Sequence, residues 1–268
     1  MSINNIHNHN MVVQDFEDNF TENEHKVWSI LFDRQYKLLQ DRAVDEILDG
    51  MKVLGVCNKM IPKFSEINAI LKRETDFSIV PVRGFIDEEL FFKFLSERKF
   101  PSTCFIRKEH ELDYLTEPDI FHDIFGHVPL LVNPIFADFM QEFGKRGLEA
   151  RELGLSKYAA ALYWFTVEFG LINTPKGMRI YGAGIISSKG ESIYSIDSAV
   201  PIRVRFDFMR AMKTQYETDS FQKTYFVING FQEMFDSLRN LDWKEIEHTC
   251  KFFPDIMHGI LINKEEEV

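Results

Sequence analysis

The sequence predicts a single, mainly α-helical domain of the α+β class. Segments with helix-start signals and helical hydrophobic spacing outnumber the short segments that alternate as strands do. The 268 residues suffice for one domain with a well-buried core. No internal repeat, low-complexity linker or change in composition divides the chain. We therefore expect a disordered tail over residues 1–20, one catalytic domain over residues 21–263 and a charged tail over residues 264–268.

Helix signals dominate the first part of this domain. Thr21 and Glu24 form a capping-box pattern that opens an amphipathic helix. A second helix is expected over residues 47–54, ended by Gly55, and a third follows Ser65. These helices precede the candidate site residues, so we interpret them as scaffold.

Short strands then alternate with helices along the rest of the chain. A strand over residues 77–82 leads through a turn to a helix capped by Asp87. Further strands are expected over residues 102–107, 178–181, 202–206 and 225–228. Further helices are expected from Asn133-Pro134 onward and over residues 157–171, 231–238 and 243–252. Gly182 and Gly184 fit either a close approach of backbone to a ligand or a hairpin or bulge.

Composition and charge narrow the classes of partner. The 31 basic and 42 acidic residues give a net charge of −11 without a long basic run, which argues against nucleic acid or an anionic membrane surface. The three cysteines form no C-x-x-C pair, and they fit a reducing cytosol. No secretory signal or membrane-spanning apolar run is present. We expect a cytoplasmic protein, monomeric or a small homo-oligomer, that acts on small molecules.

Two histidines in one apolar stretch are the first candidate metal ligands. His122 and His127 lie between Pro118-Asp119, a helix start, and Gly126 and Pro129, a helix end. Residues five apart on a regular α-helix point in different directions. For both rings to meet, the helix has to widen into a π-turn or stop near Gly126. The alternative is a pair of core histidines bonded to backbone carbonyls.

Glu168 is the candidate third ligand. It lies in an otherwise apolar segment, residues 157–171, where a carboxylate has to be paired, protonated or bound to a metal. No Lys or Arg stands one helical turn away from it. The alternative is a glutamate that faces a water-filled groove. Two histidines and one carboxylate leave three octahedral positions open, as in non-haem iron(II) oxygenases. Zinc is the rival metal, but the H-E-x-x-H pattern of zinc hydrolases is absent.

Three motifs in order resemble the pterin-dependent aromatic amino acid hydroxylases, and in particular the short bacterial phenylalanine 4-hydroxylases. They begin at His122 (HDIFGHVP), Tyr163 (YWFTVEFGL) and Tyr181 (YGAG). The resemblance implies a helical basket with short strands around a central iron site. His122, His127 and Glu168 match the family's iron ligands.

The same resemblance implies roles for further residues. Arg107 matches the residue that grips the substrate carboxylate, and Asp119 matches the acid that orients it. The remaining substrate contacts implied are Pro118, Trp164, Phe169, Gly184, Ser187 and Val227, and the pterin contacts implied are Gly84, Ile86, Phe91, Asp123 and Tyr163. Trp164 and Val227 favour phenylalanine over the other aromatic amino acids.

The resemblance thus implies a monooxygenase that converts L-phenylalanine to L-tyrosine with Fe(2+), a tetrahydropterin such as tetrahydrobiopterin, and molecular oxygen. A tyrosine- or tryptophan-hydroxylating relative is the closest alternative. A zinc metallohydrolase and a non-catalytic aromatic-ligand sensor are the alternatives from other classes.

Overall fold

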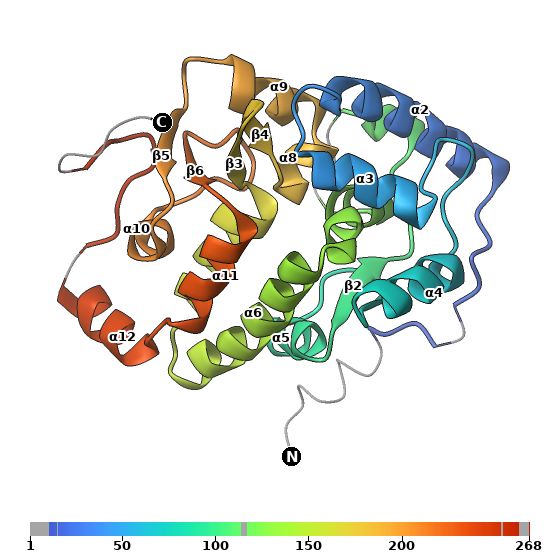
Figure 1. Ribbon diagram of the computed structural model, residues 1–268. Helices are drawn as coiled ribbons and strands as arrows, with labels where there is room; N and C mark the ends of the chain where they lie inside the picture. The colour runs from blue at the N-terminus through green and yellow to red at the C-terminus, as the bar shows by residue number, and fades with distance from the viewer. Residues whose placement is uncertain (1–10, 15, 114–116, 253, 263–267) are drawn as a thin grey trace.

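Helices make up most of the computed structural model, which describes residues 11–14, 16–113, 117–252, 254–262 and 268 (Figure 1). The α-helices are α2 (Glu22–Leu39), α3 (Asp45–Leu54), α4 (Phe64–Glu74), α5 (Glu88–Ser96), α6 (Pro134–Glu152), α7 (Ser156–Tyr163), α8 (Ala183–Ser187), α9 (Lys189–Asp197), α10 (Phe208–Lys213), α11 (Phe231–Arg239) and α12 (Trp243–Phe252). The 3-10 helices are η1 (Glu109–Glu111) and η3 (Val128–Val132), and the π-helices are η2 (His122–His127) and η4 (Trp164–Glu168). The strands are β1 (Ser78–Val82), β2 (Lys99–Thr103), β3 (Leu171–Thr174), β4 (Gly177–Ile180), β5 (Ile202–Arg205) and β6 (Thr224–Ile228). No helix in these ranges is long and apolar enough to cross a membrane.

The end signals of the first helices are confirmed, with one shift. The capping box of Thr21 and Glu24 is formed at the start of α2, and α3 ends at Gly55, whose φ is 69°. Helix α4 begins at Phe64, before the expected Ser65. Phe64 is buried and its N–H bonds to Asp18, so the first turn is fixed by packing and by a distant side chain.

The strands form two separate sheets. β1 and β2 pair in parallel, and the other sheet has the order β4-β3-β6-β5. β2 ends at Thr103, whereas the predicted strand extended to residue 107. The N–H of Arg107 donates to the Asp119 carboxylate at 2.9 Å, which takes this residue out of strand pairing. Strand β3 was not predicted, because its apolar residues continue the apolar helix before them without a break.

For the segment around Gly182 and Gly184 the sequence left open a close approach to a ligand or a hairpin or bulge, and the structure has no hairpin or bulge there. The segment forms α8 instead, followed directly by α9. A Cβ on Gly182 would lie 2.4 Å from the Glu168 carbonyl oxygen. The glycines therefore permit a close approach, but to the backbone of the candidate metal-ligand helix.

Part of the predicted tail over residues 1–20 lies among the described residues and contacts the domain. The N–H of Val13 bonds to the carbonyl of Pro81, and the N–H of Arg83 bonds to that of Met11, both along β1. The ring of Phe16 packs against Phe64 at 4.9 Å. Residues 1–10 and the predicted tail at 264–267 lie outside the described residues.

Helix α6 contributes several buried side chains to the core. It packs against α5 and α11 (Figure 1). Gly144 and Gly147 form its contact with α5; a Cβ on Gly144 would lie 2.2 Å from the N–H of Ser96. The N-cap of α6 is Asn133, which accepts bonds from two N–H groups as its Asn-Pro signal predicts.

Candidate metal centre

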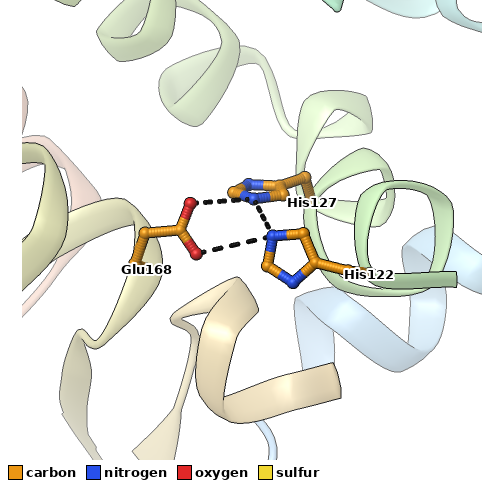
Figure 2. Close-up of side chains that lie close together, drawn as sticks. All are labelled: His122, His127 and Glu168. Atoms are coloured by element: carbon orange, nitrogen blue, oxygen red, sulfur yellow. Dashed lines mark hydrogen bonds and ion pairs between the residues drawn. The ribbon is translucent and has the colours of Figure 1, made fainter. Parts of the chain in front are cut away.

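The side chains of His122, His127 and Glu168 converge on one point (Figure 2). The two Nε2 atoms are 3.0 Å apart. Glu168 places Oε1 at 3.1 Å from the Nε2 of His127 and Oε2 at 3.7 Å from that of His122. Donors bound at about 2.1 Å to one ion, at right angles to each other, are separated by about 3.0 Å. The separations of 3.0 Å and 3.1 Å, both measured from Nε2 of His127, therefore fit neighbouring positions on one face of an octahedral metal site.

A π-helix brings the two histidines together. Residues His122–His127 form η2, one of the two arrangements that their five-residue spacing allows if both rings are to meet. Asp119 begins this turn, because its carboxylate accepts the N–H of His122 at 3.1 Å. Glu168 also ends a π-helix, η4. All three candidate ligands thus come from π-helical turns.

Ser187 sets the proton position on His122. Its hydroxyl donates to the carbonyl of Ala183 and lies 2.9 Å from the Nδ1 of His122. Since the single hydroxyl proton is used on Ala183, Nδ1 of His122 is the donor in this pair. The lone pair of Nε2 then faces the cluster, ready for a cation. Burial lowers the pKa of His122 to about 4, which keeps the ring neutral at physiological pH.

Glu168 stays ionised although it is buried. Burial raises its pKa, but the neighbouring His127 and His122, a bond from His127 and a bond from the N–H of Gly184 outweigh it, so the pKa is lowered overall. The donor set is therefore two imidazoles and one carboxylate. This chemistry suits iron(II), and the chain's own residues supply it without rearrangement.

Arg107 and Asp119 form a buried pair next to the cluster. The Nε and Nη2 atoms of Arg107 donate to the two carboxylate oxygens of Asp119, each at 2.9 Å. Asp119 is fully buried and Arg107 is 8% exposed. Burial raises the pKa of Asp119, but its bonds with Arg107 and the N–H of His122 lower it overall. Because Asp119 bonds both Arg107 and the first turn of η2, it fixes the arginine relative to the histidines.

The guanidinium of Arg107 keeps a second edge for a ligand. Nε–H and one Nη2–H point to Asp119, while the edge formed by Nη1 and Nη2 faces away from that carboxylate. A planar guanidinium can fork onto a carboxylate at each edge. The arrangement can therefore bind the carboxylate of an amino acid at a fixed angle.

Aromatic rings surround the candidate metal ligands. Tyr163 lies 6.4 Å from the ring of His127 and meets Phe91 edge to face at 5.2 Å. Trp164 packs against Phe169, with ring centroids 4.7 Å apart. Such walls suit a flat aromatic ligand and keep bulk water away.

Asp123 lies behind the cluster. It accepts bonds from the N–H and the hydroxyl of Thr103, at the end of β2. Burial raises its pKa to about 6, and the Thr103 bonds counteract part of this rise. Thr103 was not among the predicted site residues, because a threonine in a strand carries no distinguishing signal.

The structure places the remaining predicted site residues as follows. Pro118 precedes the Asp119 turn, and Val227 is buried on β6 opposite Leu171. Gly84 and Ile86 lie in the loop between β1 and α5. Gly184 packs against Phe169, since a Cβ there would lie 2.9 Å from the ring. Ser187 was predicted near the substrate, whereas its hydroxyl bonds His122.

Comparisons with known proteins agree with this geometry. The family model described as biopterin-dependent aromatic amino acid hydroxylase matches residues 4–253. The chain is 54% identical over 220 residues to a phenylalanine-4-hydroxylase of Chromobacterium violaceum, which covers 82% of this chain and 74% of that protein.

Solved structures of the phenylalanine hydroxylase from that organism have the same fold. The one with bound oxidised Fe(III) gives a TM-score of 0.92 at 45% identity and covers 100% of both chains. The one with iron(III) and the oxidised cofactor 7,8-dihydrobiopterin gives 0.91 at 45% identity, covering 100% of this chain and 99% of that one. The α+β fold class with short strands is confirmed. The chain belongs to the family of biopterin-dependent aromatic amino acid hydroxylases.

Proposed function

We propose that this protein hydroxylates L-phenylalanine to L-tyrosine, using non-haem iron(II), a tetrahydropterin and molecular oxygen. The observation that carries the proposal is the facial arrangement of His122, His127 and Glu168, with the free edge of Arg107 nearby. The relatives that are phenylalanine-4-hydroxylases, at 45–54% identity, support the choice of substrate.

In this proposal the protein contributes position and a dry environment. His122, His127 and Glu168 hold iron on one face, and the iron and pterin supply oxygen activation and two electrons. Arg107 binds the substrate carboxylate, and Asp119 holds the guanidinium at the angle needed. Trp164 and Phe169 form the wall against which the substrate ring packs, with Pro118, Gly184, Ser187 and Val227 near it.

A second set of residues forms the proposed pterin contacts. Phe91 and Tyr163, which meet edge to face, are the candidate rings for pterin packing. Gly84, Ile86 and Asp123 complete the proposed pterin contacts. We also propose a cytoplasmic location, in keeping with the three free cysteines.

The test is direct. The purified protein is loaded anaerobically with iron(II) and mixed with oxygen, tetrahydrobiopterin and phenylalanine, and tyrosine is measured together with oxygen consumption. We expect tyrosine in proportion to phenylalanine consumed, and none from the Glu168→Ala protein. Tyrosine and tryptophan serve as competing substrates. Faster turnover of either than of phenylalanine would reassign the substrate, and absence of pterin-dependent oxygen uptake with all three would refute the proposal.

A further inference from the structure

Tyr216 packs against Trp164 in the candidate substrate wall, although the sequence analysis assigned it no role. It lies in the connection between α10 and β6. Its ring stacks on Trp164 with the centroids 4.8 Å apart and the planes 23° apart. Phe169 also packs on Trp164, at 4.7 Å and 32°. Gly184 then packs against Phe169, because a Cβ on Gly184 would lie 2.9 Å from that ring. The rings of Tyr216, Trp164 and Phe169 form one aromatic row.

The aromatic row runs beside the metal cluster. Trp164 begins η4 and Glu168 ends it, so the row is tied to the candidate ligand by a single π-helical turn. Trp164 is partly exposed, yet its Nε1 atom is buried and has no hydrogen-bond partner among the described residues. The exposed part of the Trp164 side chain therefore does not include the polar nitrogen, so it is suited to packing against an apolar ring.

A segment near the C-terminus bonds to residues on either side of Tyr216 in the chain. We call residues 255–260 the C-terminal strap. The N–H of Ile256 donates to the carbonyl of Lys213 at 2.7 Å, and its carbonyl accepts the N–H of Gln215 at 2.9 Å. The Nε2 of His258 lies 2.9 Å from Oε1 of Glu217.

These contacts fall on both chain neighbours of Tyr216. Gln215 is fixed through its backbone and Glu217 through its side chain, so the residue between them has little freedom to move. Further along the strap, Arg210 donates Nη2–H to the carbonyl of Ile260 at 2.7 Å, which anchors its far end on α10. The strap thus restrains the chain on either side of Tyr216, whose ring also meets Phe165 edge to face at 6.1 Å.

We propose that Tyr216 is a positioning residue for the aromatic substrate: held by the C-terminal strap, it fixes the tilt of Trp164 and so the shape of the surface that receives the substrate ring. This inference rests on the proposed function and adds to it a residue outside the predicted site. The hydroxyl of Tyr216 is dispensable in this role, since the contact with Trp164 is made by the ring. Removing the ring lets Trp164 reorient, which weakens binding of phenylalanine and relaxes selection against larger rings.

The experiment compares Tyr216→Ala, Tyr216→Leu and Tyr216→Phe with the unmodified protein. For the first two we expect the KM for phenylalanine to rise about three- to tenfold, as the loss of an aromatic pair predicts. The Kd for phenylalanine, measured anaerobically by calorimetry, is expected to rise in parallel. The ratio of kcat/KM for tryptophan to that for phenylalanine should increase. Tyr216→Phe should restore all three values to within about twofold.

Bound iron and the KM for tetrahydropterin separate positioning from general damage, and both should stay unchanged in all three variants. An unchanged phenylalanine KM and Kd in Tyr216→Ala and Tyr216→Leu would overturn the inference. So would a rise that Tyr216→Phe does not reverse, or a loss of iron equal to the change in KM. If the unmodified protein makes no tyrosine, the proposed function falls first and the inference with it.

The strap is tested with a matched pair of proline substitutions. Ile256→Pro removes the N–H that bonds Lys213, whereas Met257 is 62% exposed and its N–H makes no bond to Lys213 or Gln215. We expect Ile256→Pro to raise the phenylalanine KM in the same direction as Tyr216→Ala, and Met257→Pro to have a smaller effect. Equal values for the two proline variants would remove the strap from the proposal.

Discussion

His122 and Ser187 show how one hydroxyl prepares a metal ligand. Because Ser187 donates its proton to Ala183, it can only accept from His122, and this fixes which nitrogen is free for a metal. We predict that Ser187→Ala lowers the affinity for iron(II) about tenfold, in the range typical of residues that orient metal ligands. Anaerobic titration with iron(II) measures this. Ser237→Ala, which removes a hydroxyl bonded within α11, is the control and should bind iron normally.

Arg107 is expected to act on substrate binding and not on the metal. Replacing it by Ala removes the free guanidinium edge, so we predict a rise of at least about tenfold in the phenylalanine KM, since a charge-assisted pair is lost. Arg107→Lys keeps the charge but cannot fork, and should recover only part of the affinity. Iron content, measured by metal analysis, should be retained in both. An unchanged KM in Arg107→Ala would exclude the arginine as the carboxylate site.

Glu191 is a buried acid remote from the candidate ligands, and it predicts a pH dependence of stability. It accepts bonds from the Tyr225 hydroxyl and from the N–H of Gln222 at 3.0 Å. Burial raises its pKa from 4.5 to about 7. Between these two values the unfolded chain releases a proton that the folded chain retains, so stability falls as pH rises from 4.5 to 7. The difference between the pKa values corresponds to about 3 kcal/mol.

Glu191→Gln should remove this dependence, because an amide can still accept both bonds and does not ionise. We expect the Tm of the variant, measured by scanning calorimetry, to fall less than that of the unmodified protein between pH 5 and pH 8. The loss of unfolding free energy that the variant avoids should be about 3 kcal/mol. Parallel pH profiles for the two proteins would contradict the assignment.

The contact between α5 and α6 depends on two glycines. A Cβ at position 144 would lie 2.2 Å from the N–H of Ser96 and 2.6 Å from the carbonyl of Phe92, both backbone atoms that cannot turn aside. We predict that Gly144→Ala lowers the free energy of unfolding by about 2 kcal/mol or more, since the helices have to separate. Urea denaturation measures this. Lys145→Ala, an exposed neighbour on α6, should change stability by about 0.5 kcal/mol at most.

Elements were predictable where the local sequence decides them. The Thr21 and Asn133 caps hold because a side chain bonds the first free N–H groups of its own helix. The spacing of His122 and His127 narrowed the turn between them to a π-turn or a helix end near Gly126, and the structure has the π-turn. Strand β3 was missed because its apolar residues continue those of the preceding helix, although its partner β4 is close in sequence. Thr103 and Tyr216 were missed because their contacts, with Asp123 and Trp164, join residues far apart in the sequence.

At the scale of the whole molecule, the metal site joins separate parts of the chain. Its histidines and its glutamate lie on η2 and η4, with α6 and α7 between them in sequence. An ion that binds only to the folded state should raise the free energy of unfolding by about 2.7 kcal/mol when free iron(II) is 100 times the Kd. The Tm should rise with it. A chelator should reverse this gain. Glu168→Ala should show no such shift, and a normal shift in that variant would exclude Glu168 as a ligand.

The boundary of the domain was the least predictable large-scale feature. Met11, Val12 and Val13 form a short apolar run within the stretch predicted as a tail, and their backbone pairs along β1. Backbone pairing of this kind uses N–H and carbonyl groups that every residue carries, so a run of three apolar residues does not identify its partner strand.

The π-helical turns imply an unusual pattern of tolerance to change in this protein. Each residue removed from a helix rotates all that follows by about 100°. Deleting one residue between the histidines would restore regular α-helical winding there and leave them four apart, a spacing that keeps both on one face. Inserting one residue would leave them six apart, about 120° from each other around a regular helix. Insertion libraries should thus find this short window intolerant even where conservative substitutions survive, because the register of the turn and not only the identity of its side chains brings the two rings together.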